Sequence, residues 1–328
     1  MRYMLRVVFM GTPQFAVPAL EALGASGDSV IAVVTQPDRP KGRGQKIQSP
    51  PVKVVAERDR IPVFQPEKIR KNLEFLESLK KLKPDLIVVA AYGMILPKEI
   101  LDLARFGCIN IHPSLLPKYR GAAPIPWAIL NGDAKTGVTI MKLNEQMDAG
   151  DILMQKEEAI FPNDTTSTLE ERLSKLGAQM LIETIQLLKM GKLVPVPQDS
   201  SKAVIIPLLK KGDGKIDWSE STEKIIRKVR AFNPWPGAYT PFEGKLCKIW
   251  KAKFGDTILI SNQNKHCVPR GGPGVVLSTA GDLLHVATPD GVVAIEELQL
   301  EGGRRMSAKD FLRGHPIPSG MVFGQDSS

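Results

Sequence analysis

Runs of β-branched and other apolar residues alternate with helix-like segments through the first half of the chain, and this alternation limits the fold most strongly. Strand-like runs cover residues 5–10, 30–35, 62–65, 85–91 and 108–112, and helix-like segments cover 14–23, 52–58, 73–82 and 98–104. The run at 85–91 is continuously apolar after its first residue, which is typical of a strand buried on both faces. This order of elements predicts an α/β fold with a doubly wound, mostly parallel, Rossmann-like sheet.

A sheet of this type binds ligands beyond the carboxyl ends of its strands. The residues expected at that edge include segment 35–46, Tyr92 and His112. Thr12 is expected to cap the first helix, and Pro13 fits its first turn. The turn before this helix lacks the Gly-x-Gly-x-x-Gly pattern, so a dinucleotide site is not indicated.

The length of 328 residues predicts two domains, because one ordinary core rarely grows that large. We expect a first domain at 1–190, a Pro-rich linker at 191–207 and a second domain at 208–328. The last segment contains one amphipathic helix at 222–232 and several short strands broken by Gly and Pro. Short strands at this spacing predict a small antiparallel β-barrel, similar to those that bind oligonucleotides.

Composition excludes several classes of protein. The apolar fraction of 43% excludes disorder as the main state, and no stretch reaches the roughly 18 apolar residues of a membrane span. The chain starts with a strand-like run and without a recognisable signal peptide. Cys108, Cys247 and Cys267 form neither a zinc spacing nor a disulfide framework. We therefore expect a cytoplasmic protein without a metal, and a monomer, since nothing in the sequence demands a dimer.

The formal net charge is 44 − 35 = +9, and the positive residues are clustered. One cluster consists of Arg39, Lys41, Arg43 and Lys46. Pro and Gly between these residues disfavour a helix or a central strand, which predicts a flexible basic loop. A second enrichment spans residues 210–270, with 13 Lys and Arg against 6 Asp and Glu. Two basic regions indicate a polyanionic partner.

Asn110 and His112 form the densest chemical signal in the chain. They are two residues apart in a predicted strand and therefore lie on the same face. An Asn amide can donate to a developing oxyanion, and a His can transfer protons near neutral pH. Asp148, in a predicted loop at 144–151, could orient His112. Sequence alone leaves open that His112 is a structural residue and that Asp148 only forms local hydrogen bonds.

These residues and several neighbouring motifs resemble the folate-dependent formyltransferases. The shared motifs are Asn-x-His-Pro-Ser-Leu-Leu-Pro at 110–117, Tyr-Arg-Gly-Ala-Ala-Pro at 119–124, the segments 11–16 and 35–40, and Asn-Pro-Trp-Pro-Gly-Ala at 233–238. The resemblance covers nearly the whole chain. It implies transfer of a formyl group from 10-formyltetrahydrofolate to an amine, on a formyltransferase domain followed by a small barrel. No Ser or Cys nucleophile is needed, because the amine itself attacks.

The resemblance also assigns roles to single residues. Asn110 and His112 are expected to stabilise the oxyanion of the tetrahedral intermediate, and Asp148 to orient His112 and a bound water. The residues expected to contact the folate are Ser114, Leu115, Leu116, Pro117, Tyr92 and Met94.

The resemblance also implies the acceptor, initiator methionyl-tRNA, and the two basic regions agree with a tRNA as partner. Arg39, Lys41, Arg43 and Lys46 are expected to contact the tRNA, with Arg43 as the most important contact because its planar fork suits phosphates and base edges. The second domain is expected to add phosphate contacts.

Two alternatives remain at this point. An amino sugar nucleotide could accept the formyl group by the same chemistry, although so small an anion does not require such widely distributed positive charge. The chain could also be a tRNA-binding protein that has lost catalysis, but the intact Asn110, His112 and Asp148 argue against this.

Overall fold

The computed structural model describes residues 4–41, 46–256, 272–279 and 282–324. The chain divides into two compact units that interleave in sequence. The first unit contains residues 1–124, 135–159 and 169–207, and the second contains 125–134, 160–168 and 208–328. The segment 191–207, expected to be a linker, therefore packs with the first unit. Within the described residues, no helix is long and apolar enough to cross a membrane.

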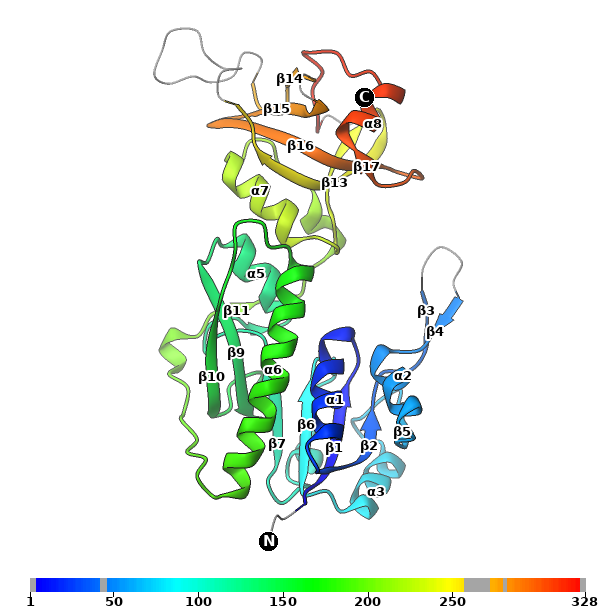
Figure 1. Cartoon of the computed structure of the whole chain (residues 1–328), viewed down its shortest axis with the longest axis vertical. Coiled ribbons are helices and arrows are strands. Elements are labelled where there is room, and N and C mark those ends of the chain that lie inside the picture. The colour runs from blue at the N-terminus through cyan, green and yellow to red at the C-terminus, as the bar shows by residue number, and fades with distance from the viewer. Residues whose placement is uncertain (1–3, 42–45, 257–271, 280–281, 325–328) are drawn as a thin grey trace. The chain divides into compact units, whose positions relative to one another are not determined.

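The first unit is built on a seven-stranded sheet with the order β10-β9-β7-β6-β1-β2-β5 (Figure 1). Its parallel strands are β1 (Arg6–Gly11), β2 (Ser29–Val34), β5 (Val63–Phe64), β6 (Leu86–Ala90) and β7 (Cys108–His112). The strands β9 (Lys135–Lys142) and β10 (Ile152–Ala159) run antiparallel at one end and were not predicted. The expected α/β fold with a mostly parallel sheet is confirmed.

Helices connect the strands and cover the sheet. They are the 3-10 helix η1 (Gln14–Ala16), α1 (Val17–Ala25), α2 (Pro51–Arg58), α3 (Leu73–Leu82), α4 (Lys98–Leu101) and α6 (Thr166–Lys189). The helix α5 (Pro124–Leu130) belongs almost wholly to the second unit. The helix α3 begins where the side chain of Asn72 accepts a hydrogen bond from the Phe75 N–H at 3.0 Å. It ends at Lys83, whose φ of 46° breaks the helical repeat.

The two faces of the sheet pack against different helices. Side chains of α3 and α4 form a buried cluster with Val8, Met10, Ile87 and Cys108 on one face. The helix α6 approaches the other face so closely at Gly177 that an added Cβ would lie 2.7 Å from Ile111. Alternation along β7 therefore directs Asn110 and His112 to the face opposite α6.

Thr12 does not cap a helix, so that prediction is wrong. The 3-10 helix η1 follows Pro13 and has no side-chain cap. The Thr12 hydroxyl instead donates to the Tyr92 carbonyl at 3.1 Å and accepts from the Gln36 N–H at 3.3 Å. Through these two hydrogen bonds the hydroxyl links the segment after β1 to the segments that follow β2 and β6. Backbone groups there have no partners within the sheet.

The basic segment contains two short strands, whereas the sequence predicted a loop. The strands β3 (Arg39–Lys41) and β4 (Lys46–Gln48) pair antiparallel in a separate two-stranded sheet. Proline is tolerated here because both strands are edges. Next to the hairpin, Asp38 accepts hydrogen bonds from Lys53 at 2.7 Å and Gln65 at 2.8 Å, and the bond from Lys53 in particular lowers the pKa of Asp38.

The second unit contains an antiparallel sheet with the order β12-β13-β16-β15-β14, and β17 pairs with β16 (Figure 1). Its elements are α7 (Thr222–Ala231), β12 (Ala238–Phe242), β13 (Lys245–Phe254), β14 (Val276–Ser278), β15 (Leu284–Thr288), β16 (Gly291–Leu300), β17 (Met306–Ser307) and α8 (Ala308–Gly314). One of the short strands expected in this domain, at residues 257–261, lies outside the described residues.

The segment 321–324 connects the two edges of this sheet. Its residues Met321 and Phe323 exchange backbone hydrogen bonds with Val276 and Gly274, at 2.7 and 2.8 Å, beside β14. The Gly324 N–H donates to the carbonyl of Pro241 in β12 at 3.4 Å. This arrangement agrees with the expected small antiparallel barrel.

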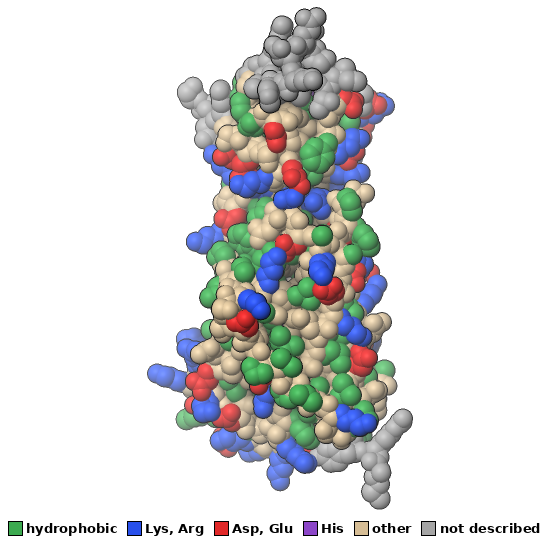
Figure 2. All heavy atoms as spheres, turned by 90° about the vertical axis from the view of Figure 1, so that its left-hand side faces the viewer, with side chains coloured by type: hydrophobic (Ala, Val, Ile, Leu, Met, Phe, Trp, Pro, Cys, Tyr) green, Lys and Arg blue, Asp and Glu red, His purple; other side chains and the backbone are tan. Residues whose placement is uncertain are grey.

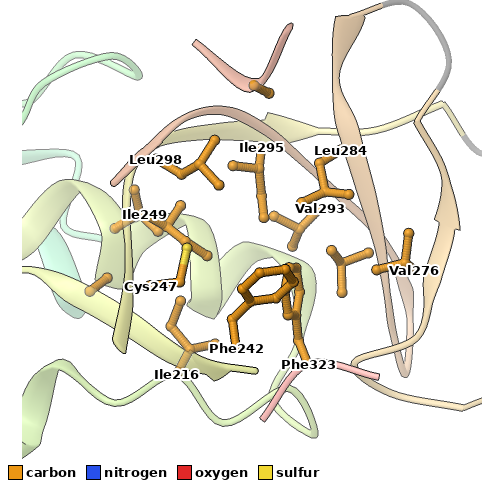
Figure 3. Packing of buried hydrophobic residues seen from close by; sticks show 14 of the residues in the cluster. Ile216, Phe242, Cys247, Ile249, Val276, Leu284, Val293, Ile295, Leu298 and Phe323 are labelled. Carbon is orange, nitrogen blue, oxygen red and sulfur yellow. The ribbon is translucent and has the colours of Figure 1, made fainter. Parts of the chain in front are cut away.

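In the core of the second unit, the rings of Phe242 and Phe323 lie among aliphatic side chains (Figure 3). The ring centroids of Phe242 and Phe323 are 5.4 Å apart in an edge-to-face arrangement, and Phe242 packs on Phe311 at 6.0 Å. Trp218 stacks on Phe323 and donates from its indole N–H to the Thr240 hydroxyl at 3.1 Å. These contacts draw the terminal segment and α8 into the same core as the strands.

Candidate active site

The strand β7 places Asn110 and His112 at the centre of the first unit's sheet. Asn110 pairs with Val89 of β6 and Met141 of β9, and His112 lies opposite Thr139 of β9. His112 is the last residue of the strand, so its side chain reaches the carboxyl edge. Its exposed fraction is 4%, and Asn110 is half-buried.

Hydrogen bonding determines which nitrogen of the His112 ring carries a proton. The Nε2 atom lies 2.9 Å from the carbonyl oxygen of Tyr119. A carbonyl oxygen only accepts, so Nε2 must donate and the neutral ring has its lone pair on Nδ1. This Nδ1 lies 3.8 Å from Oδ2 of Asp148, which is longer than a hydrogen bond but within ion-pair distance. A proton that arrives on Nδ1 would therefore be stabilised by the carboxylate.

Asp148 reaches His112 from the loop between β9 and β10. Its backbone has a φ of 49°, a conformation that Asp tolerates better than most residues. Its Oδ2 accepts a hydrogen bond from the Gly121 N–H at 2.8 Å, and 15% of its side chain is exposed. The structure thus brings together two residues that are 36 positions apart in sequence, a proximity that sequence could not establish. The catalytic roles themselves stay a prediction.

The predicted folate turn at 114–117 is held by hydrogen bonds of its own and by hydrogen bonds to Thr139 and Gln155. The hydroxyl of the buried Ser114 donates to the Lys118 carbonyl at 2.7 Å, so it stabilises the turn internally. The buried Leu116 donates from its N–H to the Thr139 hydroxyl at 3.2 Å and accepts at its carbonyl from Gln155 at 3.0 Å. Leu115 and Pro117 are half-buried and offer more accessible surface. Folate contacts from this turn stay a prediction.

Tyr92 lies below the carboxyl edge, within the core. It is 2% exposed, and its hydroxyl has no hydrogen-bond partner among the described residues. Burial raises the pKa of this phenol to about 12. Only its carbonyl takes part in the polar contacts at the edge, where it accepts from Thr12 and Gln36. Met94 packs against the same buried cluster, and folate contacts by these two side chains stay a prediction.

Three of the predicted tRNA contacts, Arg39, Lys41 and Lys46, lie in the strands β3 and β4. Arg39 forms an exposed ion pair with Glu67 at 2.6 Å, and such pairs contribute little stability, so Arg39 can exchange this partner for a phosphate. Lys41 and Lys46 pair with each other through the backbone, whereas Arg43 lies outside the described residues. On the face drawn in Figure 2, Lys and Arg side chains are mixed with Asp and Glu and form no continuous basic surface.

Two residues beside Asp148 were not predicted to belong to the site. The side chain of Arg120 donates to Oε1 of Gln198, which in turn donates from its amide to the loop that carries Asp148. Arg120 belongs to the Tyr-Arg-Gly motif and could have been found there. Gln198 gave no signal, because it follows a Pro-rich stretch that was interpreted as a linker.

Neither a metal centre nor a covalent nucleophile is found among the described residues of this site. No group of three His, Cys, Asp or Glu side chains there could hold a metal ion. The thiol of Cys108, two residues before Asn110, is buried, and burial raises its pKa to about 12. A thiol in that state is inert. The site thus combines a buried histidine, a carboxylate at ion-pair distance from it and a neighbouring Asn amide, groups that are suited to proton transfer and to stabilising an oxyanion.

Comparison with known proteins identifies the family of the chain. Residues 5–185 match the formyl transferase family model, and residues 208–316 match the formyl transferase C-terminal domain. A methionyl-tRNA formyltransferase from Geotalea uraniireducens is 48% identical over 321 residues, covering 98% of each chain. The chain therefore belongs to the formyl transferase family, and within it to the methionyl-tRNA formyltransferases.

Solved structures share the fold at lower sequence identity. HypX from Aquifex aeolicus, in complex with tetrahydrofolic acid, superposes with a TM-score of 0.62 at 19% identity, covering 94% of this chain and 47% of HypX. The sugar 3N-formyl transferase WlaRD, determined in the presence of dTDP and 5-N-formyl-THF, gives a TM-score of 0.63 at 19% identity and coverages of 89% and 98%. At these identities the likeness establishes the fold alone.

Proposed function

We propose that this chain transfers the formyl group of 10-formyltetrahydrofolate to the α-amino group of methionyl-initiator tRNA, which gives N-formylmethionyl-tRNA for the start of translation. The proposal rests chiefly on the pairing of His112 Nδ1 with Asp148 Oδ2 at 3.8 Å beside Asn110, in a chain 48% identical to a named methionyl-tRNA formyltransferase. The folate is a co-substrate, and no metal takes part.

In the proposed reaction the amine nitrogen attacks the formyl carbon and a tetrahedral oxyanion forms. The Asn110 amide donates a hydrogen bond to this oxygen. His112 already uses Nε2 for the Tyr119 carbonyl, so its donor to the oxyanion must be a protonated Nδ1, which the Asp148 carboxylate stabilises. The bond between the carbon and N10 then breaks while the Nδ1 proton of His112 passes to N10 through a bound water, and the proton released by the amine returns to Nδ1.

The acceptor is proposed to be a tRNA and not a sugar nucleotide. The structural likeness to a sugar formyltransferase does not favour a sugar, since 19% identity carries the fold alone. The 13 Lys and Arg at 210–270, against 6 Asp and Glu, are more than a small anion requires. A tRNA-binding protein without catalysis is disfavoured because His112 and Asp148 lie within ion-pair distance. A cytoplasmic location and a monomeric state stay predictions from the sequence.

The direct test supplies the purified chain with 10-formyltetrahydrofolate and either methionyl-initiator tRNA or a dTDP-linked amino sugar. We expect formylmethionine on the tRNA, detected by mass spectrometry after mild hydrolysis, and no formylated sugar. Uncharged tRNA serves as the control, because it lacks the attacking amine. Formylation of the amino sugar alone, or of neither acceptor, would contradict the proposal.

Replacing Arg43 with alanine should impair the use of tRNA without affecting the folate. One lost charge-assisted contact corresponds to about a tenfold rise in KM for methionyl-tRNA. The KM for 10-formyltetrahydrofolate should stay unchanged. Arg70→Ala is a matched control, because Arg70 is an exposed arginine of the first unit outside the basic segment. An equal effect of both substitutions would attribute the loss to net charge and contradict a specific role for Arg43.

A further inference from the structure

The segment 196–206 lies along the loops that form the proposed active site. Val196 exchanges two backbone hydrogen bonds with Ile152, at 2.8 and 2.9 Å, where β10 begins. Further along, β11 (Ile205–Ile206) pairs in parallel with β8 (Arg120–Gly121). The residues between these two contacts are thereby fixed beside both the Asp148 loop and the turn that follows His112.

Gln198 lies in this segment, and both the oxygen and the nitrogen of its side-chain amide have hydrogen-bond partners. Its Nε2 donates to the carbonyl of Asp148 at 2.9 Å and to the carbonyl of Gly150 at 2.7 Å. Its Oε1 accepts from Nε and Nη2 of Arg120 at 3.0 and 2.8 Å. An amide has two donor hydrogens and two acceptor lone pairs, and these four hydrogen bonds use all of them. Turning the amide over would exchange its donors and acceptors and break all four bonds. Arg120 is 7% exposed, which keeps solvent from competing for its guanidinium.

The loop held by Gln198 has a shape that needs external support. Asp148 has a φ of 49°, and a Cβ added to Gly150 would lie 1.7 Å from the Lys142 carbonyl oxygen. Backbone in such a conformation persists when surrounding groups hold it. Two hydrogen bonds from one amide to alternate carbonyls hold the loop from outside, and the Gly121 N–H holds the Asp148 carboxylate from the other side.

We infer that Gln198 is a positioning residue for Asp148. Its amide links the buried Arg120 by hydrogen bonds to the backbone at 148–150. This link keeps the Asp148 carboxylate directed at Nδ1 of His112. This inference rests on the proposed function. Gln198 itself touches none of the reacting atoms; it acts through Asp148, and its removal should therefore affect the rate more than substrate binding.

The first test is Gln198→Leu, which removes all four hydrogen bonds with little change in side-chain size. We expect kcat for formylation of methionyl-tRNA to fall by about 10- to 100-fold, as for other losses of groups that orient a catalytic side chain. The KM values for tRNA and folate should change by less than about twofold. A kcat within twofold of the unchanged protein, or a loss confined to KM, would overturn the inference.

The second test asks whether Gln198 acts through Asp148. In a double-mutant cycle, adding Gln198→Leu to Asp148→Asn should cost no further rate, because the positioned charge is already absent. If Gln198 had only a structural role, Gln198→Leu would lower the rate by the same factor with and without Asp148→Asn, and this result would overturn the inference. The unchanged protein is measured in parallel. If it does not formylate methionyl-tRNA, the proposed function fails. If it does, an unexpected result with the variants contradicts only the role of Gln198.

A matched control and a second variant address folding. Gln299 in β16 also accepts from a side-chain N–H, that of Trp250 at 3.0 Å, and donates to a carbonyl, that of Gly303 at 2.9 Å. Gln299→Leu should leave kcat unchanged. If Gln198→Leu does not fold, Gln198→Glu decides: its ionised side chain keeps an oxygen for Arg120 but cannot donate to the two carbonyls. The same fall in kcat supports the inference, and an undiminished kcat overturns it.

Discussion

Replacing His112 with alanine is expected to lower kcat for formyl transfer by about 10³-fold while substrate binding stays nearly intact. The ring is 4% exposed, and its Nδ1 lies 3.8 Å from Oδ2 of the Asp148 carboxylate. The Nε2–H bonds to the Tyr119 carbonyl and so fixes the ring orientation. Loss of the imidazole therefore removes both the proton carrier and one donor to the oxyanion.

The measurement is a single-turnover rate with charged initiator tRNA, together with the Kd for 10-formyltetrahydrofolate and for tRNA. His315→Ala is the control, because His315 is exposed at the end of α8 in the second unit. Denaturant unfolding should accompany the rates, since the Tyr119 carbonyl loses its partner at a cost of about 1–3 kcal/mol. A folded His112→Ala protein with a rate within tenfold of the original would refute the catalytic assignment.

Replacing Asp148 with asparagine is expected to lower kcat by about 10²-fold or more with little effect on the fold. Asparagine keeps an oxygen that can accept from the Gly121 N–H and tolerates the φ of 49° at this position. The substitution therefore removes the negative charge beside His112 without releasing the loop. The loss in rate isolates the electrostatic contribution of the carboxylate to a protonated Nδ1.

The rates should be compared with those of Asp151→Asn, three residues further along and at the start of β10. Asp151 contributes its carbonyl to the Lys142 N–H, a backbone bond that the substitution preserves. Thermal unfolding of Asp148→Asn should match that of the unchanged protein within a few degrees. Equal rates for the two variants would show that the charge at position 148 does not act on His112.

Local patterns predicted the parallel half of the sheet well. The helix α3 and the strand β7 have the bounds expected from apolar spacing, because each buries one well-defined set of side chains. The strand at 85–91 was expected to be buried on both faces, and every residue of β6 is buried. The antiparallel strands β9 and β10 were missed. In the exposed half of β10, Gln155, Lys156 and Glu157 are three consecutive polar residues. This half therefore lacks the alternation of apolar and polar residues that indicates a strand.

Side-chain roles were harder to predict than elements. Thr12 was expected to be a helix cap, but its hydroxyl joins three loops that meet only in the folded sheet. Tyr92 follows a strand at the correct edge, yet its ring turns into the core. In both cases the residue type and position fitted more than one role, and the choice depended on partners distant in sequence.

The sequence by itself determined the chain's family and the identities of the residues that carry its proposed chemistry, because motif spacing within β7 and the turn after it is a local property. Only the tertiary structure decided that Asp148 lies 3.8 Å from His112, and that Gln198 donates hydrogen bonds to the loop that carries Asp148. Contacts of this kind join residues 36 and 50 positions apart. They arise from sheet order and loop closure, which no local pattern of residues encodes.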